Sequence, residues 1–175
     1  VSQIITKAGT KLYSSRCPRF VERSWQQKGV EICHDHEIDA IVAIGGDGTF
    51  RGATALSNLG IPSIGIPGTI DNDISCTNYC IGFDTAANTA IQCIDKLRDT
   101  MQSHERCSVV EVMGRNAGYL AIYVGLAVGA TAVLVPEEEI DFERDVIEKI
   151  RQARFNGFTH YMIVVAEGAG SAADI

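Results

Sequence analysis

Short apolar runs alternate with longer amphipathic segments along the chain. The runs have strand length, are continuous rather than alternating, and lie at residues 39–44, 61–66, 109–113, 131–135 and 161–166. The segments between them have the length and spacing of helices and lie at residues 48–58, 84–101, 117–128 and from 141 onward. Continuous apolar strands separated by helices are typical of a parallel sheet covered on both faces. We therefore expect a three-layer α/β fold with a parallel sheet between helices.

The segment over residues 84–101 has one apolar face. We expect Asp84 to cap its amino end, because Asp is among the residues preferred at that position. The apolar side chains recur at helical spacing, at Ala87, Ala90, Ile91, Ile94, Leu97 and Met101. This face is expected to be the buried side of the helix.

One uncharged stretch, residues 116–136, is long enough to cross a bilayer. It is divided at residues 129–131 into a helix-length segment and a short β-branched run. We interpret it as a buried helix followed by a buried strand, and we expect no membrane association.

Polar and glycine-rich segments follow four of the expected strands. They lie at residues 45–49, 67–73, 114–116 and 167–168. In open parallel sheets, ligands bind at the carboxyl ends of the strands. We expect the four loops to gather at one edge, with the junction of two α/β halves in the polar loop 67–82 or the helix after it.

The segment Gly45–Thr49 (GGDGT) lies between an expected strand and an expected helix. Glycines let phosphate oxygens approach the backbone, and a helix N-terminus offers unpaired N–H groups. Asp47 would repel a phosphate unless a cation intervenes, so its natural role there is to hold Mg²⁺, directly or through water. A tight strand-to-helix turn with Asp as N-cap is the alternative. The complete motif favours a nucleotide-phosphate loop but does not define the substrate.

The segment Pro67–Asp73 (PGTIDND) places two carboxylates at a strand end. Phosphoryl transfer needs a base for the acceptor hydroxyl and metal-bridged phosphates in line with it. Asp71 can be that base, and Asp73 can be a metal or orienting partner. A turn held by Asx side chains is the alternative. A calcium loop is a further one, but the alternating acids and the later Glu that it needs are missing.

Two further strand ends carry groups suited to a phosphorylated ligand. Arg115, in the segment Met113–Arg115 (MGR), can bind a phosphate through two parallel hydrogen bonds. Glu167 follows the run 161–166 and could accept hydrogen bonds from sugar hydroxyls. Taken alone, each residue is as consistent with a surface pair as with a binding role.

Composition narrows the classes of protein. Of 175 residues, 46% are hydrophobic and 21% are charged, which is ordinary for a globular core. The formal net charge of −7 argues against a dedicated nucleic-acid binder. Glycine is enriched, with 17 residues, and seven of them lie between positions 45 and 68. Such a cluster indicates backbone that turns sharply or approaches a ligand closely.

Six cysteines and four histidines show no spacing typical of a zinc site. We interpret the cysteines as reduced thiols of a cytoplasmic protein. His34 and His36 flank Asp35 and could chelate a metal, although a solvated loop is favoured. No secretory signal is visible at the start, and both ends are expected to be cut edges of a longer protein.

Five motifs together resemble the 6-phosphofructokinase family. They share its order and spacing and are Gly45–Thr49, Pro67–Asp73, Ile81–Ala86, Val109–Arg115 and Ala166–Gly168. PGTIDND together with MGR is specific, whereas GGDGT alone occurs in several kinase families. The resemblance implies the family's Rossmann-like fold, incomplete at both ends. Residues 1–82 would belong to the nucleotide-binding domain and residues 83–175 to the sugar-phosphate-binding domain.

The resemblance implies a glycolytic kinase that transfers the γ-phosphate of ATP to the 1-hydroxyl of fructose 6-phosphate with Mg²⁺. Asp71 would be the catalytic base, with Asp73 and Arg115 also assigned to catalysis. ATP would contact Arg16, Cys17, Gly46, Asp47, Gly48 and Thr49, with Asp47 as the magnesium ligand. The sugar phosphate would contact Thr69, Ile70, Asp71, Met113, Gly114, Arg115 and Glu167. Arg106 would reach it from a neighbouring subunit, since the family is usually tetrameric.

Two positions concern the phosphoryl donor. Pyrophosphate-dependent relatives tend to carry Asp where Gly48 stands and Lys where Gly68 stands. Glycine at both positions resembles the ATP-dependent type. A pyrophosphate-dependent transferase and a non-catalytic regulatory paralogue are the alternatives. Retention of Asp71, Asp47 and Arg115 argues against the paralogue, because a protein that only binds needs no base.

The chain also departs from the family pattern. It lacks the N-terminal glycine loop and the C-terminal part that supplies further Arg and His contacts. We therefore expect the 175 residues alone to have little or no activity. The family includes allosteric enzymes, and Arg98 matches an effector-binding position. Thr131, however, stands where bacterial members carry an acid that helps to bind the effector.

Overall fold

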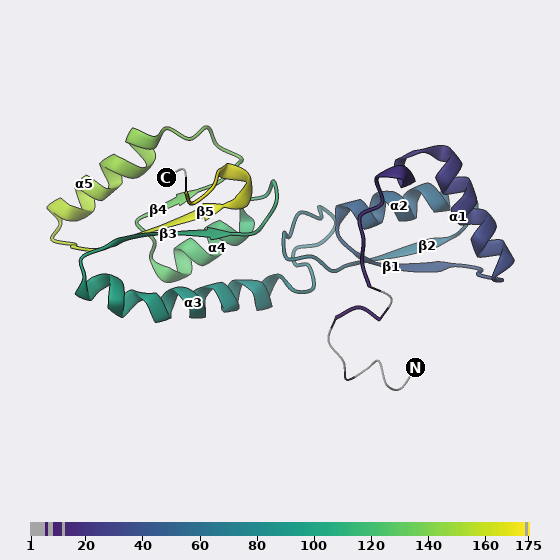
Figure 1. Ribbon diagram of the computed structural model, residues 1–175, viewed down its shortest axis with the longest axis horizontal. Coiled ribbons are helices and arrows are strands. Elements are labelled where there is room, and N and C mark those ends of the chain that lie inside the picture. Colours follow the sequence, from purple (N-terminus) through teal and green to yellow (C-terminus); the bar gives the residue numbers. More distant parts are fainter. Residues whose placement is uncertain (1–5, 7–8, 12, 174) are drawn as a thin grey trace. The chain divides into compact units, whose positions relative to one another are not determined.

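The computed structural model describes residues 6, 9–11, 13–173 and 175 (Figure 1). Its helices and helical turns are η1 (Pro18–Val21), α1 (Arg23–Asp35), α2 (Asp47–Ser57), α3 (Phe83–Ser103), α4 (Tyr119–Val128), the π-helical turn η2 (Glu143–Ile147), α5 (Glu148–Phe155) and η3 (Glu167–Ala169). Its strands are β1 (Ile41–Gly45), β2 (Ser63–Pro67), β3 (Cys107–Val112), β4 (Ala132–Leu134) and β5 (Tyr161–Ala166). Strands and helices alternate from β1 onward, so the α/β class expected from the apolar pattern is confirmed.

The chain divides into two compact units. One contains the residues up to Ala43 together with Phe50–Ile64, and the other contains Ile44–Thr49 together with Gly65–Ile175. The GGDGT segment therefore belongs to the same unit as the PGTIDND and MGR segments. The functional division at residues 82 and 83 stays a prediction.

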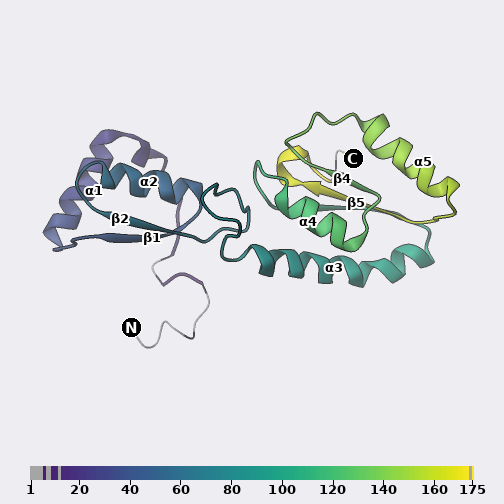
Figure 2. The same cartoon turned by 180° about the vertical axis from the view of Figure 1, so that it is seen from behind.

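Strands β1 and β2 run parallel. The Ile41 N–H donates to the Pro62 carbonyl at 2.9 Å, and the Gly68 N–H donates to the Gly45 carbonyl at 3.0 Å. Helices α1 and α2 lie on the same side of this pair (Figures 1 and 2). Phe20 of η1 lies close to Gly29 of α1 and Gly52 of α2.

The other face of this strand pair is uncovered in the part of the chain that the structure describes. Val42 and Ile44 of β1 are 60% and 66% exposed, and Ile64 of β2 is 68% exposed. Within the described residues, α1 and α2 both pack on the opposite face of this strand pair (Figures 1 and 2).

The second sheet has the order β3-β5-β4 and is parallel throughout. Cys107 pairs with Tyr161 at one end of β3, and Ala132 of β4 pairs with Ile163. The central strand β5 matches the expected range 161–166 and is buried from Met162 to Ala166. Because β5 carries apolar side chains on both faces, the sheet needs a helical layer on each side.

Both layers are present. On one face, α3 and α4 bury a core that includes Ala87, Ile94, Val124 and Val164. On the other face, β4 and β5 pack with Val146 of η2 and the apolar side of α5. This part of the chain has the three layers expected from the sequence.

Helix α3 differs from expectation at its amino end. It begins at Phe83 after Gly82, which occupies the N-cap position with a φ of 103° and provides no side-chain cap. The prediction that Asp84 caps the helix is wrong, because glycine supplies the turn and Asp84 lies inside the first helical turn. There its charge favours the helix through the macrodipole. Leu97 is also 48% exposed rather than buried.

The uncharged stretch 116–136 folds as α4 and β4, as expected. Val124 is fully buried in α4, and Leu134 is 2% exposed in β4. Among the described residues, no helix combines the length and apolar character needed to cross a membrane.

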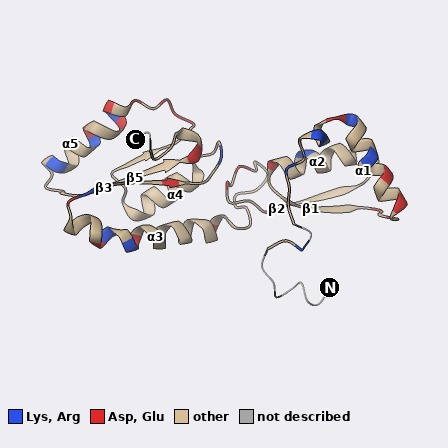
Figure 3. Cartoon of the chain, in the orientation of Figure 1, with Lys and Arg blue, Asp and Glu red and all other residues tan. Residues whose placement is uncertain are grey.

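Figure 3 shows acidic and basic residues intermixed on α1, α3 and α5.

Candidate active site

The GGDGT segment turns directly from β1 into α2. A Cβ atom added to Gly45 would lie 2.8 Å from the Thr49 Cβ, so the turn requires glycine there. A Cβ on Gly46 would lie 3.2 Å from the Thr69 Cβ, which shows how closely this segment approaches the next loop. Gly48 differs, because no atom lies within 4 Å of a Cβ added to it. The backbone at Gly48 is therefore open to a ligand.

Asp47 is the first residue of α2 and is half-buried. Its carboxylate lies at the end of the helix where unpaired N–H groups attract anions. Among the described residues, no three His, Cys, Asp or Glu side chains are grouped to hold a metal. Magnesium is commonly bound by one or two carboxylates together with substrate phosphates and water. The single carboxylate of Asp47 at this glycine-rich turn therefore fits a magnesium ion that takes its other ligands from phosphate and water.

The PGTIDND loop is held against the end of β1. The Gly68 N–H donates to the Gly45 carbonyl, and a Cβ on Gly68 would lie 3.2 Å from Ile44 Cγ2. The Asp71 N–H donates to Thr69 Oγ1 at 3.2 Å. These contacts bring Thr69 and Asp71 next to the GGDGT segment, as the sequence predicts for neighbouring strand ends.

Asn72 organises this loop, which agrees with the alternative of a turn held by Asx side chains. Its φ is 53°, a left-handed conformation that Asn tolerates better than most residues. Its side-chain Oδ1 accepts the Cys80 N–H at 2.9 Å, and its Nδ2 donates to the Asn78 carbonyl at 3.2 Å. The amide therefore ties the two ends of the loop together. The signal was present, because Asn between two aspartates is typical of Asx-stabilised turns.

Asp71 has a perturbed carboxylate. Burial raises its pKa above the ordinary value, and the neighbouring charges of Asp73 and Glu167 raise it further, whereas Arg115 lowers it. The structure therefore brings together four residues that the sequence analysis selected, from the loops after β2, β3 and β5. A half-buried carboxylate with a raised pKa has the character of a general base.

The MGR segment makes a strained turn after β3. Gly114 has a φ of 150°, and a Cβ there would lie 2.5 Å from the Ala117 carbonyl oxygen. Arg115 itself has a φ of 57°. Its backbone N–H donates to Glu167 Oε2 at 3.1 Å. Glu167 therefore contacts the backbone of the Arg115 turn, a partner that sequence reasoning did not foresee.

Three predicted site residues lie apart from this cluster in the chain. Arg16 and Cys17 are exposed residues of the first compact unit. Arg106 is exposed just before β3, whereas the MGR segment follows the other end of that strand. Arg106 and Arg115 of one chain are thus separated by the length of β3.

Arg98 and Thr131 line a cavity of about 460 Å³ together with residues from the ends of α3, α4 and α5. The Arg98 guanidinium donates to the Val128 carbonyl at the end of α4 and lies 3.7 Å from Asp95 Oδ1. Arg98 therefore already makes contacts within the chain. The effector role that the resemblance implies for this residue stays a prediction.

Known proteins match the chain over its whole length. A model of the family Phosphofructokinase matches residues 1–175. The ATP-dependent 6-phosphofructokinase of Bacillus thuringiensis (strain Al Hakam) is 54% identical over 175 residues, which are 100% of this chain and 54% of that protein. The protein of the same name from Bacillus anthracis (strain CDC 684 / NRRL 3495) gives the same identity and coverage. The chain spans about half the length of these curated relatives.

Solved structures of phosphofructokinases also match the chain. The phosphofructokinase of Pichia pastoris in the T-state has a TM-score of 0.85 and 32% identity, covering 94% of this chain and 21% of that chain. The pyrophosphate-dependent phosphofructokinase of Nitrosospira multiformis has a TM-score of 0.73 and 25% identity, covering 86% of this chain and 41% of that chain. With a family match over every residue and this shared fold, the chain belongs to the phosphofructokinase family.

Proposed function

We propose that the protein containing this chain transfers the γ-phosphate of ATP to the 1-hydroxyl of fructose 6-phosphate. The observation that carries the proposal is the environment of Asp71. Its loop packs on the GGDGT segment, and its carboxylate interacts with Arg115 and Glu167. This environment supports a role for Asp71 as the base, with the GGDGT segment binding the donor phosphates and Arg115 supplying a positive charge. The names of the Bacillus relatives support ATP as donor.

Asp71 would take the proton of the attacking hydroxyl. Burial and the neighbouring carboxylates raise the pKa of Asp71, which makes its carboxylate a stronger base than an exposed Asp. Asp73 would orient the acceptor or help to hold the metal. Arg115 would stabilise negative charge on the transferring or sugar phosphate. The hydroxyl proton would pass to Asp71 as the bond from the sugar oxygen to the γ-phosphorus forms and the bond from the γ-phosphorus to the β-phosphate oxygen breaks, which releases ADP.

The amino end of α2 would bind the donor phosphates. Gly48 and Thr49 lie in the first turn of α2, and Gly46 directly precedes the helix. Their backbone N–H groups would bind phosphate oxygens there, because the helix dipole favours anions. Bound magnesium would offset the phosphate charge, and Asp47 is the residue that would hold it. Arg16 and Cys17 would add contacts to the nucleotide.

The sugar phosphate would lie between the loops after β2, β3 and β5. Thr69 and Ile70 precede the base, and Met113 and Gly114 lead to Arg115. Glu167 accepts the hydrogen bond from the Arg115 N–H with one carboxylate oxygen. Its second oxygen could accept a hydrogen bond from a sugar hydroxyl. Arg106 would act from another copy of the chain, so the proposal includes a homo-oligomer.

The cytoplasm is the location we propose. Cys17, Cys33, Cys76, Cys80, Cys93 and Cys107 are all free thiols. Unpaired cysteines in this number are typical of a reducing compartment. Cys80 is buried, and burial raises its thiol pKa, which keeps the thiol in its unreactive protonated form.

A donor assay tests the proposed function. The full-length protein should form fructose 1,6-bisphosphate from fructose 6-phosphate with ATP and magnesium, and far more slowly with pyrophosphate. Phosphorus NMR of the products would show which donor is used. Rapid turnover with pyrophosphate but not ATP would favour the alternative enzyme, and turnover with neither would favour a non-catalytic paralogue.

Gly48→Asp tests the reason for the ATP preference. The added side chain meets no atom within 4 Å at its Cβ, so the protein should fold with an unchanged melting temperature. The carboxylate would occupy space beside the donor phosphates, and kcat/KM for ATP should fall at least about a hundredfold. Gly48→Ala adds a side chain without a charge and is the matched control, so its kcat/KM for ATP should fall much less. Full ATP turnover by Gly48→Asp would show that the steric and charge argument is wrong.

A further inference from the structure

Three loops join at the carboxyl ends of β3, β5 and β4. We call residues 113–118, which connect β3 to α4, the Arg115 loop. Its Arg115 N–H donates to Glu167 of the β5 end. Its Gly118 N–H donates to Glu137 Oε1 of the β4 end at 2.7 Å. A carboxylate therefore holds each side of the Arg115 loop.

The Glu137 contact caps helix α4. Gly118 is the N-cap residue of α4 and has no side chain with which to satisfy the first N–H groups. The Glu137 carboxylate accepts one of them and places negative charge at the positive end of the helix. A Cβ on Gly118 would lie 2.6 Å from Glu137 Oε2 and from the Val135 Cβ. The glycine thus permits the close approach that this bond needs.

The loop between the two carboxylates holds an unfavourable conformation. Arg115 has a φ of 57° and Gly114 a φ of 150°. A non-glycine residue in the left-handed region persists where the surrounding contacts fix it. Within the loop, the Ala117 N–H donates to the Gly114 carbonyl at 2.9 Å. Loss of an outer carboxylate would therefore let the turn relax and move the Arg115 side chain.

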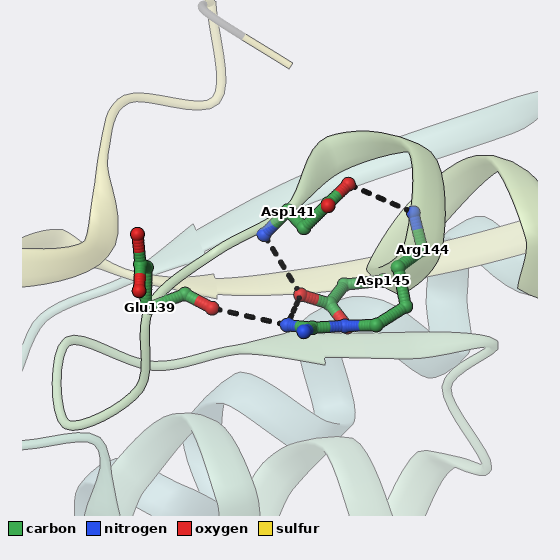
Figure 4. Close-up of polar contacts among 4 residues, drawn as sticks. All are labelled: Glu139, Asp141, Arg144 and Asp145. Atoms are coloured by element: carbon green, nitrogen blue, oxygen red, sulfur yellow. Dashed lines mark hydrogen bonds and ion pairs between the residues drawn. The ribbon is translucent and has the colours of Figure 1, made fainter.

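The segment that carries Glu137 is itself anchored at its far end (Figure 4). Arg144 Nη2 donates to the Glu139 carbonyl at 3.1 Å and pairs with Asp145 at 2.7 Å. The Asp141 N–H donates to Asp145 Oδ2 at 3.0 Å. Glu137 is therefore presented from a segment fixed between β4 and η2.

We propose that Glu137 is a positioning residue that holds Arg115 in place for the phosphorylated substrate, acting through the Gly118 N–H and the Arg115 loop. The identity of that substrate, fructose 6-phosphate, rests on the proposed function. Glu137 itself contacts neither reactant. Its effect should therefore fall on the sugar-phosphate side of the reaction and leave the GGDGT segment unaffected.

Steady-state kinetics of the full-length protein test this role. Glu137→Ala should raise KM for fructose 6-phosphate about tenfold and change KM for ATP by less than about twofold. Glu137→Gln keeps an oxygen acceptor and should stay near the parent values. Glu139→Ala is the matched control, since its carboxylate points away from the Arg144 and Asp145 groups in Figure 4. The proposal would be overturned if Glu137→Ala changed the KM values for fructose 6-phosphate and ATP equally, or changed neither. It would also be overturned if Glu137→Gln raised the KM for fructose 6-phosphate as much as Glu137→Ala.

Hydrogen–deuterium exchange tests the same role without turnover. The peptide that contains residues 113–118 should exchange faster in Glu137→Ala than in the parent or Glu139→Ala. Unchanged exchange would overturn the proposal even if the kinetics could not be measured. Should Glu137→Ala fail to fold, Glu137→Asp replaces it, because the shorter side chain also loses the bond. A parent protein that does not phosphorylate fructose 6-phosphate would refute the proposed function, and exchange would still decide the role of Glu137.

Discussion

Asp71 is surrounded by charges of both signs, and their balance determines how readily its carboxylate takes up a proton. Burial, Asp73 and Glu167 raise its pKa, and Arg115 is the cation that opposes them. A catalytic base must be ionised in order to act, so activity should be lost as the pH falls through the Asp71 pKa. We therefore expect Arg115 to affect the acid limb of the pH profile in addition to its proposed role in phosphate binding.

Arg115→Gln removes the charge that stabilises the Asp71 carboxylate. The pKa of Asp71 should rise, and the acid limb of the kcat/KM profile should move to higher pH in the full-length protein. Arg151→Gln is the matched control, because Arg151 is an exposed residue paired with Glu143. An acid limb that stays in place or moves to lower pH would contradict the charge balance inferred for Asp71.

At the scale of elements, the turn η2 shows how local charges form a helix end. Arg144 donates to both Asp145 carboxylate oxygens, at 2.8 Å and 2.7 Å, and the Asp141 N–H donates to the same carboxylate. These bonds, first of all the one from Arg144, lower the pKa of Asp145 to about 2. Because the folded pKa lies below the ordinary value, the bonds contribute stability at neutral pH. That contribution is lost as the pH falls through about 2.

Arg144→Ala should bring the Asp145 pKa back toward its ordinary value of 3.8. The backbone bond from Asp141 remains in the variant, so the return should be incomplete. Carboxyl carbon NMR across an acid titration measures the shift, with Arg154→Ala as a matched control on α5. An Asp145 pKa that stays at about 2 in Arg144→Ala would show that another group holds it down.

The sequence predicted the positions of the strands and helices better than it predicted where they end and what packs against them. An apolar run marked the position of each strand. The bounds of β5 agree with the expected range because polar residues flank this strand on both sides. The amino end of α3 was missed, since the positive φ of Gly82 depends on how the preceding loop is folded. Among the described residues one face of β1 and β2 is open, and an apolar strand pattern alone does not reveal whether one or two helical layers cover a strand.

The sequence predicted the carboxylates and glycines of the candidate site, but it predicted less well the contacts that hold the loops of the site in place. Asp71 and Arg115 follow from motifs at strand ends, where parallel strands bring loops together. The bond between Gly118 and Glu137 joins residues from the ends of two different strands, so only the folded sheet reveals it. The sequence offered an Asx-held turn as an alternative, but the partners of the Asn72 side chain, the Cys80 N–H and the Asn78 carbonyl, appear only in the folded loop.

At the scale of the whole molecule, strand β3 separates two arginines assigned to the same substrate. It has six residues, so Arg106 and Arg115 lie about 20 Å apart along the strand direction. One chain cannot bring both to one phosphate without rearranging the sheet. A complete site would therefore combine Arg106 of one copy with Arg115 of another.

Complementation tests this shared site. Arg106→Ala and Asp71→Asn variants of the full-length protein should each have little activity alone. Oligomers that contain both should regain activity, because an intact Asp71 then meets an intact Arg106 from the neighbour. Co-expression with two different tags would isolate the mixed oligomers for assay. Mixed oligomers no more active than either parent variant would argue that Arg106 does not act between subunits.

The most direct measurement is the kcat of Asp71→Asn in the full-length protein with saturating ATP, magnesium and fructose 6-phosphate. Asn keeps the shape of the side chain and cannot accept the hydroxyl proton, so kcat should fall about a thousandfold while both KM values change little. Asp84→Asn, an exposed carboxylate in the first turn of α3, should retain the parent kcat. A kcat for Asp71→Asn close to that of Asp84→Asn would contradict the assignment of Asp71 as the base.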